Sequence, residues 1–303
     1  MAKFKSNRDQ LVEISVIGEI SSPITNVASP YRMNPDGESM IFPGVGGITF
    51  NKRIGDSAID LWGDHIEPAV SIKNYNKDFG MGFNGALNIL ACIGNRAEII
   101  SGDAKGTWGR VTGQHGGIEH VMVDFTEEQM QTMTIGDRVQ VRAYGTGYSL
   151  TDYPGVKLRN IDPALLDVMP IKGKAKNERL QIPVTHRVPS KVMGSGLGKT
   201  HVNAGDYDIQ MFDEATVEEY GLNSLRFGDI VGIIDADNTY GRIYLQNAIS
   251  VGVIVHSRSV LAGHGPGVAT MFTSKEGLID LVIDKNANLK NYFAKLGDPA
   301  KGR

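Results

Sequence analysis

The sequence predicts a mainly β protein with two β-rich lobes, barrel-like or sandwich-like, several short helices and a C-terminal helix. An α+β arrangement is the alternative. Glycine accounts for 37 of the 303 residues, about 12% against a typical ~7%, and no collagen-like period accompanies it. Short segments rich in β-branched and apolar residues also follow one another between glycine turns. Many tight turns between short strands are typical of a β-rich fold.

The expected strands are segments in which apolar residues alternate with polar ones. In the first half they are residues 11–20, the end of 42–50, two strands within 58–72 around Gly63-Asp64, then 97–100, 109–112, 121–125 and 135–147. In the second half they are residues 230–234 and 243–256, joined as a hairpin. Residues 84–92 form either a short helix or a buried strand, because periodicity alone does not separate the two.

Four helices are expected from capping residues and apolar periodicity. Thr126 and Gln129 have the spacing of a capping box before 126–133, and Asp162 precedes a helix that starts at Pro163. The other two helices cover residues 214–220 and 286–295, and the last has an apolar face.

We expect an N-terminal β-rich domain over residues 1–170 and a C-terminal β-rich domain with the terminal helix over 171–303. The charged, non-periodic segment 172–179 marks the boundary. A long solvated hairpin tip is the alternative interpretation of this segment. Residues 101–111 (SGDAKGTWGRV) resemble the KOW motif of small SH3-like barrels and predict a tight hairpin in the first domain, with RNA binding as a weaker alternative.

Composition limits the compartment and the partners. The net charge is −3, with 31 basic and 34 acidic residues mixed along the chain, which argues against nucleic acid as a partner. Cys92 is the single cysteine, as fits a reducing compartment. No apolar run reaches the ~18 residues of a membrane span, and the N-terminus lacks a signal-peptide core. We expect a cytoplasmic protein without a membrane partner, and a homo-oligomer.

Residues 252–267 (GVIVHSRSVLAGHGPG) predict a strand that opens into a loop of small residues. Glycine lacks a Cβ atom and proline fixes φ, so such a loop can hold its backbone close to a ligand. His256 and His264 stand on either side of the turn. We expect both to bind metal and His264 also to be catalytic, although an ordinary exposed turn is the alternative for His264. The glycines expected beside the ligand are Gly263, Gly265 and Gly267.

Acidic and imidazole side chains elsewhere complete this candidate site. Asp206 and Asp208 share one face of a short strand, which costs energy unless a cation or a proton lies between them. We therefore expect both to bind metal. Asp64 and His65 are candidate catalytic residues, with His65 also a metal ligand, because a carboxylate beside an imidazole can do either task. A polar turn with a solvent-facing ion pair is the alternative.

Two further segments carry candidate ligand-binding residues. His115 and His120 flank a Gly-Gly pair, which allows the imidazoles to converge. Lys199 lies in residues 193–200 (MGSGLGKT), where Met193 occupies the position at which a phosphate-binding P-loop needs glycine. We expect a ligand-covering loop there. The sequence identifies no cofactor, but a divalent metal is the candidate.

The combined motifs resemble a bacterial family known as domain of unknown function 4438. Residues 64–71, 94–125, 205–209, 225–237, 240–242 and 263–267 carry this resemblance, which covers most of the chain and implies no catalytic residues. The segment GDYDIQ (205–210), with the strand and glycine-rich hairpin that follow, is weakly similar to the acetamidase/formamidase family and implies amide chemistry.

These observations favour a metal-assisted hydrolase that acts on amide-like bonds of a small molecule. The acid and imidazole pairs at strand ends, beside glycine loops, are the reason. A non-catalytic small-ligand-binding or assembly protein is the second hypothesis, and an RNA-binding protein the third. We also expect the two halves to share one site, because neither holds a complete set of ligands.

Overall fold

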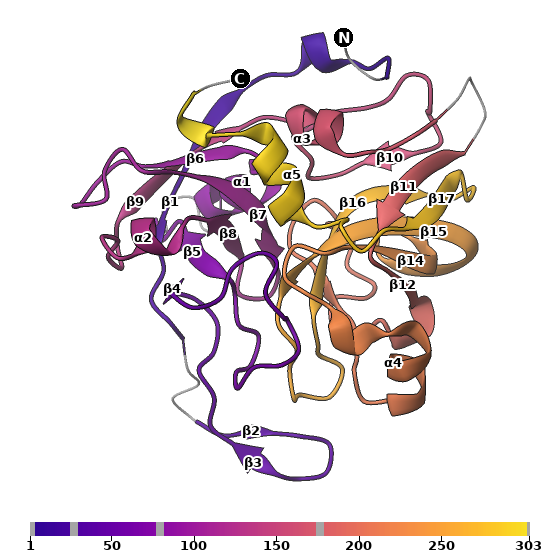
Figure 1. The fold of residues 1–303 in the computed structure, drawn as a ribbon, viewed down its shortest axis with the longest axis horizontal. Helices are drawn as coiled ribbons and strands as arrows, with labels where there is room; N and C mark the ends of the chain where they lie inside the picture. Colours follow the sequence, from indigo (N-terminus) through magenta and orange to yellow (C-terminus); the bar gives the residue numbers. More distant parts are fainter. Residues whose placement is uncertain (1–3, 25–29, 77–81, 174–178, 302–303) are drawn as a thin grey trace.

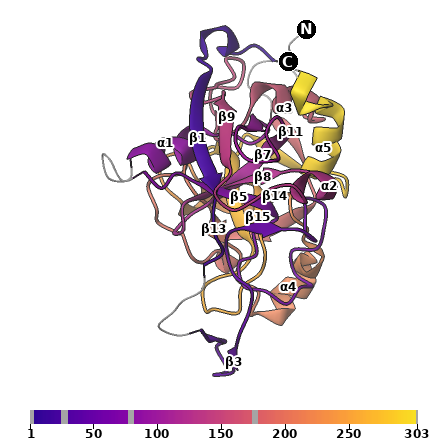
Figure 2. The ribbon, with the colours of Figure 1, turned by 90° about the vertical axis from the view of Figure 1, so that its left-hand side faces the viewer.

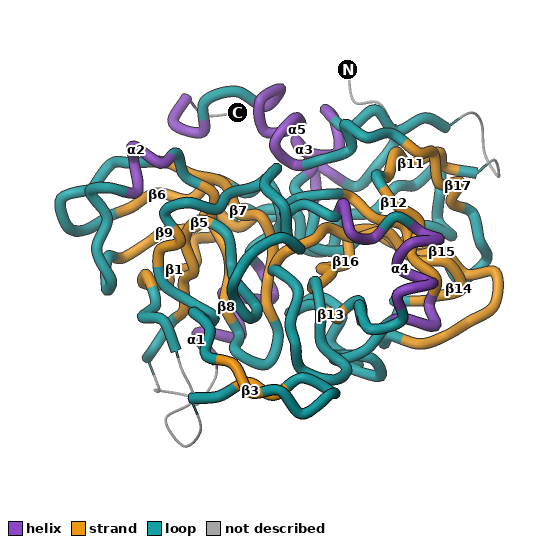
Figure 3. The backbone as a smooth tube through the Cα atoms, turned by 60° about the horizontal axis from the view of Figure 1, so that its bottom comes forward, coloured by secondary structure: helices purple, strands orange, loops and turns teal. Residues whose placement is uncertain are grey.

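The chain folds into two groups of strands, with its helices at the outside of both (Figures 1 and 3). The computed structural model describes residues 4–24, 30–76, 82–173 and 179–301. The strands of the first half are β1 (Ile14–Ile20), β2 (Arg32–Met33), β3 (Ser39–Met40), β4 (Ile48–Thr49), β5 (Ala69–Lys73), β6 (Arg96–Ile99), β7 (Trp108–His115), β8 (His120–Asp124), β9 (Arg138–Ala143) and β10 (Lys157–Leu158). Those of the second half are β11 (Leu180–Val184), β12 (His186–Pro189), β13 (Tyr207–Asp208), β14 (Ile230–Asp237), β15 (Ile243–His256), β16 (Gly267–Ser274) and β17 (Ile279–Ile283).

The helices are short. The α-helices are α1 (Gly82–Leu90), α2 (Glu127–Met130), α3 (Pro163–Val168), α4 (Glu214–Tyr220) and α5 (Leu289–Leu296). Single 3-10 turns are η1 (Arg8–Gln10), η2 (Ser190–Val192), η3 (Leu222–Ser224) and η4 (Pro299–Lys301). The expected capping box of α2 is present, and the Asp162 side chain caps α3. No helix of the described residues is long and apolar enough to cross a membrane.

Six strands of the first half form a closed antiparallel barrel. Their order is β1-β9-β6-β7-β8-β5, and β5 returns to β1 through the pairs Glu19–Lys73 and Ile20–Ile72, while β4 extends the other edge of β5. Along β9 every second residue is buried, which is the alternation expected of a strand with one face in a core. The barrel core is built mostly of valine, isoleucine and alanine, including Val16, Val70, Ile72, Ile99, Val121 and Val141.

The second lobe is a sheet with the order β10-β16-β15-β14-β12, and β13 also pairs with β16. Every residue of β16 is buried, so this strand lies in the interior of the lobe. Strand β10 pairs with β16, and Leu165 of α3 shares a core with Val253. The predicted boundary between residues 170 and 171 stays a prediction; of the charged segment meant to mark it, residues 174–178 lie outside the described part of the chain.

The lobes meet where β7 packs against β15 and β16. A Cβ atom on Gly113 of β7 would overlap the Val255 side chain of β15, so glycine permits this close approach. In Figure 1 the barrel, in indigo to magenta, lies beside the orange and yellow strands of the second lobe, and Figure 2 views the molecule with the barrel toward the reader. His115 ends β7 and His256 ends β15, which brings residues distant in sequence to one junction.

The mainly β class, the two β-rich lobes and the C-terminal helix are confirmed. Residues 84–92 lie largely in helix α1, which decides between the two alternatives for that segment. The prediction of two strands within residues 58–72 was wrong, because β5 is the one strand that forms there. His65 and Ala69 have φ values of 54° and 56°, which break the extended path before β5. Arg110, after the turn of the KOW-like hairpin β6–β7, is buried and donates to the carbonyls of Gly94 and Gly297.

Candidate metal centre

Four imidazoles and two carboxylates converge where the two lobes meet. They form two groups whose nitrogen and oxygen atoms lie within 4.8 Å of one another inside each group. We call His65, Asp208 and His264 the outer triad, because His264 is partly exposed, and the fully buried His115, Asp206 and His256 the inner triad. Each triad combines residues from both halves of the chain, so the expected convergence of the two halves is confirmed.

The outer triad has the spacing of ligands around one ion. His264 Nδ1 lies 3.1 Å from His65 Nε2 and 3.1 Å from Asp208 Oδ2, and His65 Nε2 lies 3.7 Å from Asp208 Oδ2. Ligand atoms at ~2.0–2.1 Å from a tetrahedral zinc ion are about 3.3 Å apart. Three atoms at these separations leave a fourth position open, which is the arrangement of catalytic rather than structural zinc sites.

The inner triad contains a buried contact that is not a hydrogen bond. His256 Nε2 lies 2.7 Å from Asp206 Oδ2, yet neither atom has a hydrogen-bond partner. His256 Nδ1 lies 3.0 Å from the carbonyl oxygen of Ser257, which can only accept, so Nδ1 carries the proton of the neutral ring. The lone pair of Nε2 then faces a carboxylate oxygen. Such an arrangement requires either a second proton on His256 or a cation between the two groups.

Asp208 connects the two triads. Its Oδ2 atom belongs to the outer triad, and its Oδ1 atom lies 3.6 Å from His256 Nε2 of the inner triad. The backbone holds both carboxylates in place, because Gly116 N donates to Asp206 at 2.7 Å and Gly265 N to Asp208 at 3.3 Å. Asp208 therefore places one carboxylate oxygen beside each triad.

A second set of hydrogen bonds orients the imidazoles. Asp64 Oδ2 lies 3.1 Å from His65 Nδ1, and Glu67 Oε1 lies 2.6 Å from His115 Nδ1. With Nδ1 engaged in each ring, Nε2 is the atom that remains for a ligand. Metal-binding histidines generally donate their other ring nitrogen to a carboxylate or carbonyl in this way, which fixes the tautomer.

The carboxylates that orient the imidazoles are themselves held. Asp64 accepts from the hydroxyl of Ser259 at 2.6 Å and pairs with Arg32 at 3.1 Å. Although burial acts to raise it, the pKa of Asp64 is lowered to about 2 by His65, Ser259 and Arg32. Glu67 accepts from Gly46 N at 2.9 Å and from the Ser71 hydroxyl. Both groups are therefore anionic at neutral pH and available to the imidazoles.

The triads also shift the pKa values of their own members. Burial would raise the pKa of Asp208, but the neighbouring imidazoles of His256, His264 and His65 outweigh it and hold this pKa far below the usual range. Burial would lower the pKa of His256, but the charges of Asp206 and Asp208 raise it well above the usual value. For His115 burial prevails and lowers the pKa. The centre thus favours a positive charge between its two carboxylates.

A small cavity of ≈ 110 Å³ leads to the centre. Members of both triads line it, together with Gly116 and Gly117 of the β7–β8 turn and with Ser195, Gly196 and Lys199. Among the described lining residues Lys199 is the one ionisable side chain outside the two triads. Residues 193–200, which include three of these lining residues, form a loop beside the opening. A P-loop would require a helix directly after this loop, and none follows it in the described residues.

The predicted glycines differ in their relation to the centre. A Cβ atom on Gly267 would overlap Asp206 Oδ2 and His256 Nε2, and one on Gly265 would overlap the Ile209 carbonyl. Gly263 has a φ of 80°, and nothing lies within 4 Å of its Cβ position. Gly265 and Gly267 thus allow the backbone to pass against the carboxylates, whereas Gly263 serves the turn.

Two of the predicted site residues lie outside both triads. Asp64 contacts His65 Nδ1 from behind and does not line the cavity, so the geometry gives it a positioning contact, and its catalytic role stays a prediction. His120 is fully buried with Nδ1 2.8 Å from Glu67, and it belongs to neither triad. Glu67 was missed as the partner of both His115 and His120. Glu67 lies within residues 64–71, which carry the family resemblance, but only the fold shows which imidazoles it reaches.

Comparison with known proteins gives one family. Residues 31–167 match the model described as domain of unknown function (DUF4438), N-terminal, and residues 168–293 match its C-terminal model. A solved structure described as the crystal structure of TM1086 is 42% identical, with a TM-score of 0.88, covering 95% of this chain and 99% of that one. No curated protein matches. The acetamidase/formamidase likeness rests on its sequence motif alone.

Proposed function

The chain belongs to the DUF4438 family, and we propose that it is a hydrolase that binds two divalent metal ions and cleaves amide-like bonds in a small substrate. The observation that carries this proposal is the unbonded 2.7 Å contact between His256 and Asp206, in a triad joined to a second by Asp208. A buried centre of this type is compatible with metal ions and is otherwise costly, because charged and polar groups are desolvated without partners.

The nitrogen and oxygen atoms of the two triads would suit two divalent ions such as zinc or manganese. Imidazole nitrogen and carboxylate oxygen are the ligands that such divalent ions accept. The outer triad would hold one ion and the inner triad the other, with Asp208 shared. Such a pair of ions supplies Lewis acidity at a carbonyl oxygen and lowers the pKa of a water molecule.

The protein's own residues would orient the metal ligands and select the substrate. Asp64 and Glu67 hold His65 and His115 in the ligating tautomer. The cavity of ≈ 110 Å³ admits only a small molecule or the end of a larger one. Lys199, at this opening, would orient the substrate through its ammonium group.

The test has two parts. Inductively coupled plasma mass spectrometry of the purified protein should find close to two divalent ions per chain. Ammonia release from formamide, acetamide and other short amides should be observed, should stop with a chelator, and should return when the ion is restored. A protein that binds no divalent ion would contradict the proposal. Two bound ions without turnover of any amide would instead favour the non-catalytic binding hypothesis.

A further inference from the structure

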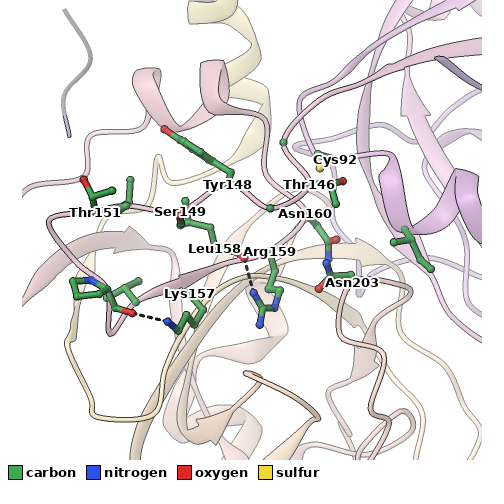
Figure 4. Close-up of a pocket in the computed structure, with 16 residues that line it drawn as sticks. Cys92, Thr146, Tyr148, Ser149, Thr151, Lys157, Leu158, Arg159, Asn160 and Asn203 are labelled. Carbon is green, nitrogen blue, oxygen red and sulfur yellow. Dashed lines mark hydrogen bonds between the residues drawn. The ribbon is translucent and has the colours of Figure 1, made fainter. Parts of the chain in front are cut away.

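A second, larger pocket lies away from the metal centre. Its volume is ≈ 540 Å³, within the ~300–1,000 Å³ typical of small-molecule sites. It lies beside β10, between the loop 145–151 and Asn203, and shares no lining residue with the cavity of the metal centre (Figure 4). We call it the Arg159 pocket.

The Arg159 pocket is cationic. Lys157 and Arg159 line it, and no carboxylate stands among its described lining residues. The Arg159 guanidinium donates to the carbonyls of Leu158 at 2.9 Å and Thr239 at 2.6 Å, while its Nε atom is buried without a partner. Backbone carbonyls hold this side chain, and Asp237, which acts on its charge, lies outside the pocket lining. The wall therefore favours an anionic ligand.

Asn160 provides a buried acceptor without a partner. The side chain is 4% exposed, and its amide orientation is defined because Nδ2 donates to two carbonyl oxygens, of Val202 and Thr270. Oδ1 then remains with no hydrogen bond. A buried acceptor left in this state costs about 1–3 kcal/mol. This oxygen has almost no accessible surface, so Asn160 forms part of the wall, and contacts to a ligand come from the exposed side chains beside it.

The remaining wall combines hydroxyl groups with apolar side chains. The lining residues with hydroxyl groups are Ser149 and Thr151, together with Thr146 and Tyr148, whose hydroxyls bond to Cys92 and Ser6. The apolar side chains are those of Ile89, Leu150, Val156 and Leu158. Figure 4 shows the labelled hydroxyl residues together with Lys157 and Arg159 around the pocket. A ligand with a polyhydroxylated body and a negative charge matches this combination of surfaces.

We propose that the Arg159 pocket binds a small hydroxylated organic anion of the phosphorylated-sugar class. The anionic group pairs with Lys157 and Arg159, and hydroxyls of the body bond to the exposed side chains of Ser149 and Thr151. This proposal is independent of the hydrolase activity, because the pocket and the metal centre have separate linings.

The test is isothermal titration calorimetry of the full chain with four probes: glucose 6-phosphate, ribose 5-phosphate, AMP and gluconate. At least one should bind saturably, and at least tenfold more tightly than glucose or inorganic phosphate alone. Lys157→Ala, a change at an exposed side chain, should weaken this binding tenfold or more. Lys105→Ala, in an exposed turn of the barrel, is the matched control and should leave it unchanged.

Two further variants test whether the probes bind in the Arg159 pocket and not at the metal centre. Ser149→Trp places a bulky ring at an exposed position of the wall and should abolish binding, with folding checked by a thermal melt. Asp208→Asn alters only the metal centre and should leave binding intact. Absence of saturable binding for all four probes up to 5 mM overturns the proposal. So does binding that survives both Lys157→Ala and Ser149→Trp, or that disappears in Asp208→Asn.

Discussion

The Nε2 atom of His256 and the Oδ2 atom of Asp206 lie 2.7 Å apart in the buried centre, and neither makes a hydrogen bond. His256 Nδ1 faces a carbonyl oxygen, so the neutral ring would present a lone pair to the carboxylate. Only a second proton or a metal ion resolves this contact. The three atoms of the outer triad lie 3.1 to 3.7 Å from one another. One proton on His256 cannot serve both the inner and the outer triad, and this favours metal ions.

Asp208→Asn should reduce the metal content from two ions per chain to one or fewer. The neutral amide is a poor ligand, and its NH₂ group would face imidazole nitrogens that also need a cation. Metal content after dialysis, measured by mass spectrometry, checks this. Asp60→Asn, at an exposed carboxylate outside both triads, is the control and should retain two ions. Full metal content in Asp208→Asn would exclude a bridging role.

Glu67→Gln should weaken metal binding without removing a ligand. Glu67 accepts from both His115 and His120, and loss of an outer-sphere carboxylate generally costs 10–100-fold in metal affinity. Competition with a chromophoric chelator measures the change. Glu127→Gln, in the exposed first turn of α2, should have no effect. An unchanged affinity in Glu67→Gln would mean that the fold alone orients His115.

Gly267→Ala and Gly263→Ala form a matched pair. The added methyl group at Gly267 would overlap Asp206 and His256, whereas the one at Gly263 meets no atom within 4 Å. Gly263→Ala should cost about 1–2 kcal/mol of stability, since φ is 80°, with metal binding retained. Gly267→Ala should lose the ion of the inner triad. Chemical unfolding and metal analysis of both proteins separate the effects, and equal metal content in the two would contradict this account.

Much of the fold was predictable because local chemistry and final structure agree. Residues 214–220 were predicted as a helix and form α4, and the segment 243–256 forms β15 with those bounds. The capping residues Thr126 and Asp162 were identified from spacing, which depends only on neighbours in the chain. The expected strand near residue 60 does not form, because residues 58–62 follow a bent path that their local pattern does not encode.

The site was predictable in its residue types but not in its pairings. His65, His256, His264, Asp206 and Asp208 were expected as ligands, since acids and imidazoles beside glycines are typical of such sites. Which imidazole meets which carboxylate depends on the barrel closing against β15, and no local pattern encodes that. His115 and His120 looked equivalent in sequence, yet only His115 joins a triad.

Cys92 should be unreactive in the folded protein. It is 1% exposed, and burial raises the pKa of its thiol to about 12, so the thiol stays protonated below that pH. At pH 8 about one thiol in 10,000 would be ionised, against roughly a quarter for an ordinary cysteine of pKa ~8.5. Modification by a thiol reagent should be at least about a thousandfold slower than in guanidinium chloride. Rapid reaction in buffer would contradict the buried position.

His264→Ala should separate binding from folding. The His264 side chain is 35% exposed, and it lies in a loop, so its loss should change the stability by about 0.5 kcal/mol or less. Its Nδ1 atom is nevertheless one of the three atoms of the outer triad, so the affinity for one ion should fall tenfold or more, about 1.4 kcal/mol. A thermal melt beside a metal titration measures both quantities on the same protein.

The control for this variant is His201→Ala, at an exposed histidine outside both triads, which should change neither quantity. His256→Ala is the opposite comparison, because that ring is fully buried and its removal should lower the melting temperature as well. If His264→Ala binds metal as the unchanged protein does, the residue belongs to an ordinary turn. If it melts far earlier, its role is structural, since an exposed ligand can be removed without disturbing the core.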